Sequence, residues 1–168
     1  MTKLPFSPIR ALLLSLLLLM TNFSLSEAAK EGFFGLPDRY NGSKLSKFGV
    51  RTKGPIKVYA VGQYGQKSFL LKMTYGVNAQ KMASALKDAL KPRCNDAKKV
   101  DEFETLMLSG LPNGAPKGTT LGFGTSDGKL SLEVNGKSVG TIGSSSLAKG
   151  FAGIYTDSKA VCSMKTIQ

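Results

Sequence analysis

The chain has 168 residues, of which 42% are hydrophobic and 20% charged, and its formal net charge at pH 7 is +12. This length and composition are ordinary for a single globular domain with an apolar core. The chain has no histidine, and its two cysteines do not form a CxxC motif. These absences exclude the usual zinc sites and every Ser-His-Asp or Cys-His nucleophile, so we expect no metal and no cofactor.

The N-terminal segment has the pattern of a signal peptide. Lys3 and Arg10 form a positive region, an apolar run follows at residues 11–20, and small residues lie around position 28. The alternative is a membrane anchor, but a spanning helix needs roughly 20 apolar residues and this run is shorter. We expect a cleaved signal peptide at residues 1–28, a domain at residues 29–168 and no transmembrane span. The protein would enter the secretory pathway, with secretion, the endomembrane system or a plastid reached by that route as destinations.

The remaining chain is strongly basic. Without residues 1–28, which carry Lys3, Arg10 and Glu27, the net charge is +11. The lysines are spread along the chain and form no basic block interleaved with aromatic residues, so we expect a solvated basic surface and no nucleic-acid partner. The sign of the charge favours an anionic membrane surface or an acidic ligand, and we expect a monomer.

Two features depend on the secretory compartment. Cys94 and Cys162 are the only cysteines, and they permit either one disulfide or two buried thiols. Asn41 begins an Asn-Gly-Ser sequon and is a candidate glycosylation site.

The first predicted strands cover residues 56–64 and 68–75 and form a hairpin punctuated by glycines. The alternation of the second strand places Phe69, Leu71, Met73 and Tyr75 on one face. For the first strand we expect one alternate set to face the core and the set that includes Tyr59 to point the other way. The expected core set is Ile56, Val58, Ala60, Gly62 and Tyr64.

Two helices are predicted next. Asn78 is a plausible N-cap for a helix that ends at Pro92, and a second helix covers residues 96–109, before the Pro- and Gly-rich segment 111–118. The expected core residues of the first helix are Met82, Ala85, Leu86, Ala89 and Leu90, and those of the second are Val100, Phe103 and Met107.

Three strands and a last helix complete the predicted order. The strands cover residues 119–123, 129–134 and 137–142, joined through Asp127-Gly128 and Asn135-Gly136, which are strong hairpin signals. Residues 144–146 can cap a helix, followed by a polar tail. The core face of that helix is Leu147, Phe151, Ile154 and Tyr155. This order predicts an α+β domain, with helices packed on one face of an antiparallel sheet.

Several stretches in this order resemble the chalcone isomerase-like family, especially its short members with signal peptides. The first is Arg51-x-Lys53 followed by KVYAVGxY at residues 57–64. The others are TYGVNAQKMASALKDALKPR, Phe103 before LPxGxxKG, and LEVNGKSVGTIGSSSLAKGFAGIY. The resemblance covers residues 35–165 and implies an open-faced β-sandwich in which a sheet and covering helices enclose an elongated ligand cleft.

The family includes enzymes that cyclise a chalcone to a flavanone and non-catalytic relatives that bind fatty acids. Arg51 matches the arginine that positions the phenolate in the enzymes, whereas Tyr59 stands where the enzymes have threonine, as in the fatty-acid-binding relatives. Asn78, Ala85 and Ile154 fall at further polar positions of the enzymes. The resemblance therefore favours a non-catalytic binder of a fatty acid or similar amphipathic carboxylate. The alternatives are a chalcone-flavanone isomerase, an intramolecular lyase relying on Arg51, and a scaffold without a ligand.

For a binder, Arg51 and Tyr59 are the candidate carboxylate site, because a guanidinium and a phenol together can donate three hydrogen bonds to it. A continuous strand would put both on one face, although Gly54-Pro55 interrupts it. The acyl chain would lie along an apolar cleft formed by Met73, Met82, Phe103 and Phe151. The alternative for these four residues is an ordinary core, and for Arg51 and Tyr59 an ordinary strand surface.

Overall fold

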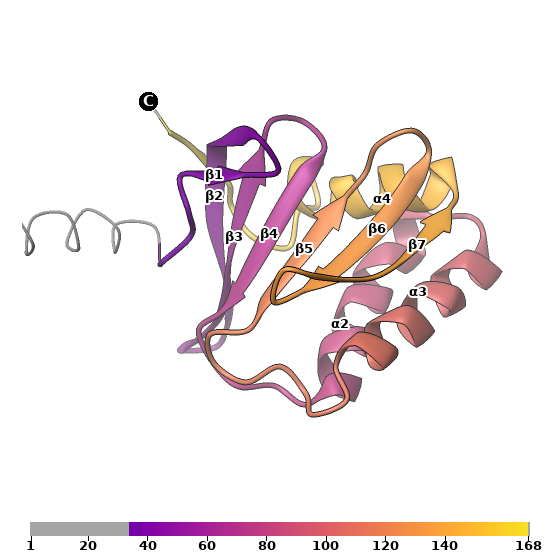
Figure 1. Ribbon diagram of the computed structural model, residues 1–168, viewed down its shortest axis with the longest axis horizontal. Helices are drawn as coiled ribbons and strands as arrows, with labels where there is room; N and C mark the ends of the chain where they lie inside the picture. Colours follow the sequence, from indigo (N-terminus) through magenta and orange to yellow (C-terminus); the bar gives the residue numbers. More distant parts are fainter. Residues whose placement is uncertain (1–33, 168) are drawn as a thin grey trace, which may run out of the picture. The chain divides into compact units, whose positions relative to one another are not determined.

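The computed structural model describes residues 34–167, so the predicted signal peptide lies outside the described residues. Residues 36–167 belong to one compact unit, shown in Figure 1. Its strands are β1 (Arg39–Tyr40), β2 (Ser43–Lys53), β3 (Ile56–Tyr64), β4 (Ser68–Met73), β5 (Thr120–Gly124), β6 (Lys129–Val134), β7 (Lys137–Gly143) and β8 (Lys165–Thr166). Its helices are α2 (Ala79–Leu90), the short 3₁₀ helix η1 (Lys91–Arg93), α3 (Ala97–Gly110) and α4 (Ser145–Thr156).

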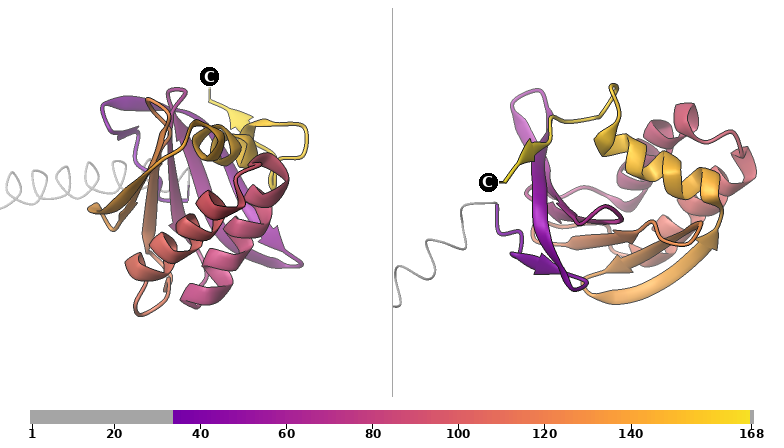
Figure 2. Two further views of the ribbon diagram at one scale, coloured as in Figure 1. Left: turned by 90° about the vertical axis from the view of Figure 1, so that its right-hand side faces the viewer. Right: turned by 90° about the horizontal axis from the view of Figure 1, so that it is seen from above.

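The strands form one antiparallel sheet in the order β1-β2-β3-β4-β5-β6-β7, and β8 pairs with β2. Each strand from β1 to β7 therefore lies beside its neighbour in sequence, even where α2 and α3 separate β4 from β5. The three helices lie on one face of this sheet, as the two views of Figure 2 show. The expected α+β architecture is confirmed.

Local signals account for the ends of most elements. The side chains of Asn78, Asp96 and Ser144 each accept a hydrogen bond from a backbone N–H in the first turn of α2, α3 and α4 respectively. At the turn between β6 and β7, Asn135 and Gly136 have φ values of 51° and 76°, the left-handed pair that a tight two-residue hairpin requires. The predicted caps of α2 and α4 and the predicted hairpins are therefore present, and Asp96 adds a cap to α3 that was expected only as the start of that helix.

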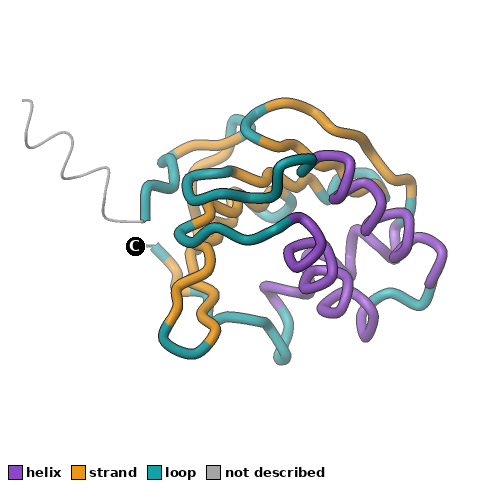
Figure 3. Tube along the Cα trace, turned by 90° about the horizontal axis from the view of Figure 1, so that it is seen from below, coloured by secondary structure: helices purple, strands orange, loops and turns teal. Residues whose placement is uncertain are grey.

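The main core lies between the sheet and the helices, which occupy separate layers in Figure 3. Cross-strand partners supply its sheet side, such as Phe69 with Phe123 and Leu71 with Leu121. The helices contribute Phe103 and Phe151, both fully buried. The stacked rings of Phe123 and Phe151, with centroids 4.2 Å apart, join the two layers.

The expected orientation of β3 is wrong. Tyr59 and Val61 face the main core, whereas Ile56 is exposed at the end of the strand. Tyr64 is also buried, but on the other face, where its hydroxyl donates to the carbonyl of Pro37 at 2.7 Å. Because both faces of β3 are covered, alternation in its sequence does not reveal which face meets the helices.

Other differences concern single residues and short pairings. Ala85 is exposed and Ala83 takes its place in the core, while Tyr75 lies beyond the end of β4 and is 54% exposed. The expected polar tail instead packs on the domain: β8 pairs with β2, and Val161, Cys162 and Met164 lie against the core.

Within residues 34–167, no helix combines the length and apolarity that crossing a membrane would demand.

Candidate functional site

Arg51 and Tyr59 are direct cross-strand partners. Gly54-Pro55 turns the chain between β2 and β3, so the two residues lie on antiparallel neighbours instead of one continuous strand. Side chains of directly opposite residues project from the same face of a sheet, about 5 Å apart at Cβ. The structure therefore brings the two predicted carboxylate ligands together, by a geometry different from the one expected.

The hydroxyl of Tyr59 shares a buried hydrogen bond of 3.3 Å with the hydroxyl of Tyr155 from the last turns of α4. Burial raises the pKa of Tyr59 to about 12, and the bond to Tyr155 and the nearby Arg51 guanidinium only partly oppose it. Burial also raises the pKa of Tyr155 well above its ordinary value, and the neighbouring Tyr59 adds to the effect. Both phenols are therefore protonated donors at neutral pH.

The side chain of Arg51 is exposed and holds the C-terminal tail. Its Nη1 donates to the carbonyl of Val161 at 2.8 Å, and the N–H of Val161 in turn donates to the carbonyl of Ile154 at 2.9 Å. The tail continues over Gly49, where a Cβ would come within 2.7 Å of the carbonyl oxygen of Ser163. A residue larger than glycine at this position of β2 would displace the tail, and with it the partner of Arg51.

We call Arg51, Tyr59, Tyr155 and Cys162 the arginine-tyrosine cluster. Burial raises the pKa of the Cys162 thiol, and the positive charge of Arg51 acts in the opposite direction. The cluster offers a guanidinium and two phenols at one margin of an apolar core, with the guanidinium exposed and the phenols buried. Such a set of donors suits an oxyanion attached to an apolar body.

Tyr155 is the member that sequence reasoning did not assign to the site. The sequence pattern predicts only that Tyr155 belongs to the apolar face of the last helix, and the family resemblance puts Ile154 at the hydroxyl position. The available signal was its phenol, because a buried tyrosine hydroxyl usually requires a hydrogen-bond partner.

The four residues expected to line an apolar cleft are all buried in the main core. Met73 is the cross-strand partner of Tyr59 and lies nearest to the arginine-tyrosine cluster along the sheet. Phe151 and Phe103 belong to an aromatic group with ring centroids 6.1 Å apart. The contact of Met82 and the other three with an acyl chain stays a prediction.

Cys94 and Cys162 are free thiols in the structure, so the disulfide that the sequence permits is not formed. Cys94 lies near Ser146 at the start of α4, with 3.5 Å between Sγ and Oγ, whereas the segment of Cys162 joins α4 at Ile154. Ser146 and Ile154, which make these two contacts, lie about 12 Å apart along the axis of α4. A disulfide requires Cα atoms within about 7 Å of each other.

Asn41 occupies the tight turn between β1 and β2 with φ of 48°, and its side chain is exposed. Its glycosylation stays a prediction.

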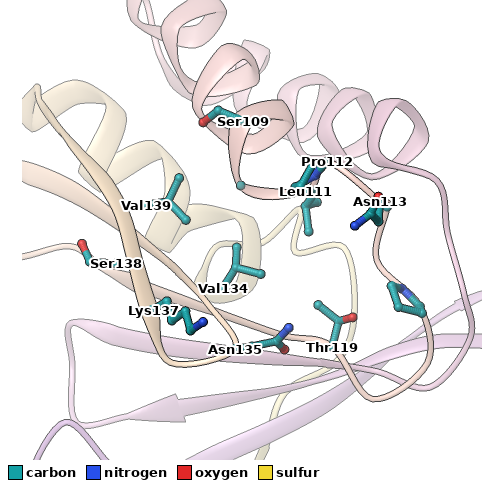
Figure 4. Close-up of a pocket in the computed structure, with 13 residues that line it drawn as sticks. Ser109, Leu111, Pro112, Asn113, Thr119, Val134, Asn135, Lys137, Ser138 and Val139 are labelled. Carbon is teal, nitrogen blue, oxygen red and sulfur yellow. The ribbon is translucent and has the colours of Figure 1, made fainter.

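A surface pocket of about 600 Å³ lies elsewhere, between the C-terminal end of α3 and the hairpin of β6 and β7 (Figure 4). Its walls combine Val134 and Val139 with the polar side chains of Asn113, Asn135 and Lys137. A second pocket of about 450 Å³ lies beside η1. Neither pocket is lined by a member of the arginine-tyrosine cluster. In the described part of the chain, no three His, Cys, Asp or Glu residues are grouped so as to hold a metal ion.

Tyr59→Phe is expected to reduce the loss of stability at alkaline pH. Tyrosine in the unfolded chain ionises near pH 10, whereas folded Tyr59 has a pKa of about 12, so raising the pH above 10 favours unfolding of the wild type. This contribution should destabilise the wild type by about 1 kcal/mol at pH 11 and about 2 kcal/mol at pH 12, relative to neutral pH. Urea unfolding of both proteins at pH 8, 10 and 11 measures the difference, and parallel profiles would contradict the burial of this phenol.

Comparisons with known proteins place the fold. No family model matches the sequence, and no curated protein matches it. Among solved structures, the chain matches the crystal structure of a fatty-acid binding protein from Arabidopsis thaliana with a TM-score of 0.67. The two share 18% sequence identity over 76% of this chain and 86% of the Arabidopsis chain. The expected chalcone isomerase-like fold, an open-faced sandwich of an antiparallel sheet and helices, is therefore confirmed.

Proposed function

We propose that this protein binds a fatty acid or a similar amphipathic carboxylate, and that Arg51 and Tyr59 hold the carboxylate. The observation that carries the proposal is the direct pairing of these two residues across β2 and β3. It is supported by the likeness of the fold to a protein described as fatty-acid binding.

The carboxylate would exchange existing hydrogen bonds for stronger ones. The Arg51 guanidinium already donates to the Val161 carbonyl, and among residues 34–167 its side chain makes no second hydrogen bond. A carboxylate accepting two parallel bonds from a guanidinium gains more than a neutral carbonyl does. The Tyr59 hydroxyl would turn from Tyr155 to the second acceptor, and Tyr155 would stay within reach as a further donor.

The acyl chain would enter the main core from the arginine-tyrosine cluster. Met73 lies opposite Tyr59, and Met82 adds a second thioether to the same core. Methionine has three rotatable bonds and a polarisable sulfur, so it can change rotamer to admit a chain where a branched residue cannot. Each methylene buried in this way stabilises the complex by about 0.8 kcal/mol.

Native mass spectrometry of the purified protein, followed by extraction of whatever it carries, tests the proposal. We expect the wild type to retain an acid of fatty-acid mass and Arg51→Ala to lose it. Lys47→Ala is the matched control, because it removes an exposed cation four residues earlier in β2 and leaves Arg51 and Tyr59 intact. An acid retained equally by Arg51→Ala would contradict the site. A wild type that carries no acid and takes up none when incubated with palmitate would contradict the function.

A further inference from the structure

Between Asp38 and Asp88, the charged residues of the domain are all cations, because the sequence there contains no aspartate or glutamate. Over the same stretch the cations are Arg39, Lys44, Lys47, Arg51, Lys53, Lys57, Lys67, Lys72, Lys81 and Lys87. Strands β2, β3 and β4 come from this stretch and carry six of these cations, namely Lys44, Lys47, Arg51, Lys53, Lys57 and Lys72.

The hairpin of β2 and β3 ends in an exposed tip within this part. Residues 51–57 are all exposed, and Ile56 at the tip is 42% exposed. Tyr75, which is 54% exposed, lies beside the same hairpin because its N–H donates to the carbonyl of Val58 at 3.2 Å. In the described part of the chain, large hydrophobic side chains are exposed only at these two positions and at Phe34.

A third segment adds charge to this end of the domain. The loop before β5 pairs with the loop after β4 through two hydrogen bonds of 2.8 and 2.9 Å between Val77 and Ala115. The pairing places Lys117 against Gly76, next to Tyr75. Figure 1 shows the β2–β3 turn and both loops along the same edge of the domain. Among residues 34–167, neither Lys53 nor Lys117 takes part in an ion pair.

We propose that this edge, the hairpin-tip surface of Lys53, Ile56, Tyr75 and Lys117, docks on an anionic lipid bilayer. A single exposed apolar residue has no special meaning. Here an aliphatic tip and a tyrosine lie with Lys53 and Lys117, which form no ion pair among residues 34–167, and this combination matches the apolar and charged layers of a bilayer surface. The tyrosine suits the interface, where its ring is buried and its hydroxyl stays hydrated. The cations face the anionic headgroups, and each contributes attraction near the surface.

The docking surface does not depend on the proposed function, because it excludes Tyr59 and needs no bound acid. Arg51 lies on the same hairpin, two residues before Lys53, so a docked domain would hold the arginine-tyrosine cluster close to the bilayer. An acid leaving the membrane would then meet the guanidinium first.

Sedimentation with vesicles tests the electrostatic part. The protein lacking residues 1–28 is used, because the apolar run at 11–20 would itself bind lipid and the core described above lies within residues 36–167. We expect binding to vesicles of phosphatidylcholine with 30% phosphatidylglycerol and none to phosphatidylcholine alone. Lys53→Ala should weaken binding about fivefold, which corresponds to about 1 kcal/mol. Lys98→Ala, an exposed lysine at the start of α3, removes the same charge and should change binding less than twofold. Equal losses in the two variants, or no binding by the wild type, would overturn the proposal.

A fluorescence experiment tests the apolar part. The chain has no tryptophan, so Ile56→Trp introduces a single reporter at the tip. With anionic vesicles its emission should shift to the blue and be quenched by brominated lipid. Ala85→Trp, at an exposed position of α2, is the matched control and should show neither change. A response from Ala85→Trp equal to that of Ile56→Trp, or none from Ile56→Trp in a sample that sediments, would place the membrane contact elsewhere and overturn the proposal.

Discussion

Phe151→Ala is expected to lower the free energy of unfolding by about 3 to 5 kcal/mol, because it removes a fully buried ring from the centre of the core. Phe151 stacks on Phe123 and makes further ring contacts with Phe69, Phe103 and Tyr155. Aromatic pairs of this kind add to the free energy gained from burial alone. Urea unfolding monitored by circular dichroism measures the change at neutral pH.

Phe151→Leu is the control, since it keeps most of the volume and should cost clearly less than the alanine variant. The comparison also distinguishes a packed core from a cleft. A ring that lines an open cleft touches neighbours on one side only, so its truncation leaves little new cavity. A loss below about 1 kcal/mol for Phe151→Ala would contradict the packed position and favour a lining role.

Arg51→Ala is expected to weaken binding of a long-chain fatty acid about 10- to 100-fold, because a hydrogen bond to a charged group is worth about 1.5 to 3 kcal/mol. Arg51→Lys should recover only part of this affinity, since an ammonium keeps the charge and loses the paired donors. Isothermal titration with palmitate measures the affinities. Thermal unfolding of the same samples reports separately on the bond between Arg51 and Val161.

The matching alcohol gives the sharper comparison. Hexadecanol has the same chain as palmitate and no carboxylate. Its binding free energy therefore includes the burial of the chain in the apolar core and lacks the contribution of the carboxylate. The wild type should prefer the acid, and Arg51→Ala should bind acid and alcohol with similar affinity. If Arg51→Ala still preferred the acid, the result would contradict Arg51 as the carboxylate ligand and would indicate that another cation binds the carboxylate.

Elements that depend on local signals could be predicted. The predicted caps Asn78 and Ser144 act on N–H groups three residues away, and Asn135-Gly136 adopts its turn with little help from the rest of the domain. The same Asn-Gly signal occurs at Asn41-Gly42, where it forms the turn of the β1–β2 hairpin. The same pair belongs to the Asn-Gly-Ser sequon, which by itself predicts no turn.

Pairings between distant segments could not be predicted in the same way. β8 consists of two residues, and its partners Lys47 and Phe48 lie more than 100 positions earlier in the sequence. A pairing of this size leaves no periodicity, and its stability comes from the packing of Val161 and Met164 on the core. The sequence pattern also predicts no separate strand at residues 43–53, so it does not predict that Arg51 pairs with Tyr59 across a turn.

The sequence by itself determined the class of the fold, the helices with their caps, the hairpin turns and the identity of Arg51 and Tyr59 as candidate ligands. Only the tertiary structure decided that these two residues meet across a turn, that Tyr155 completes the cluster and that Ile56 and Tyr75 share one exposed edge. The physical reason is the distance along the chain over which each kind of interaction acts. Caps and turns act within a few residues, whereas the neighbours of a side chain across a sheet are set by register and by what covers each face.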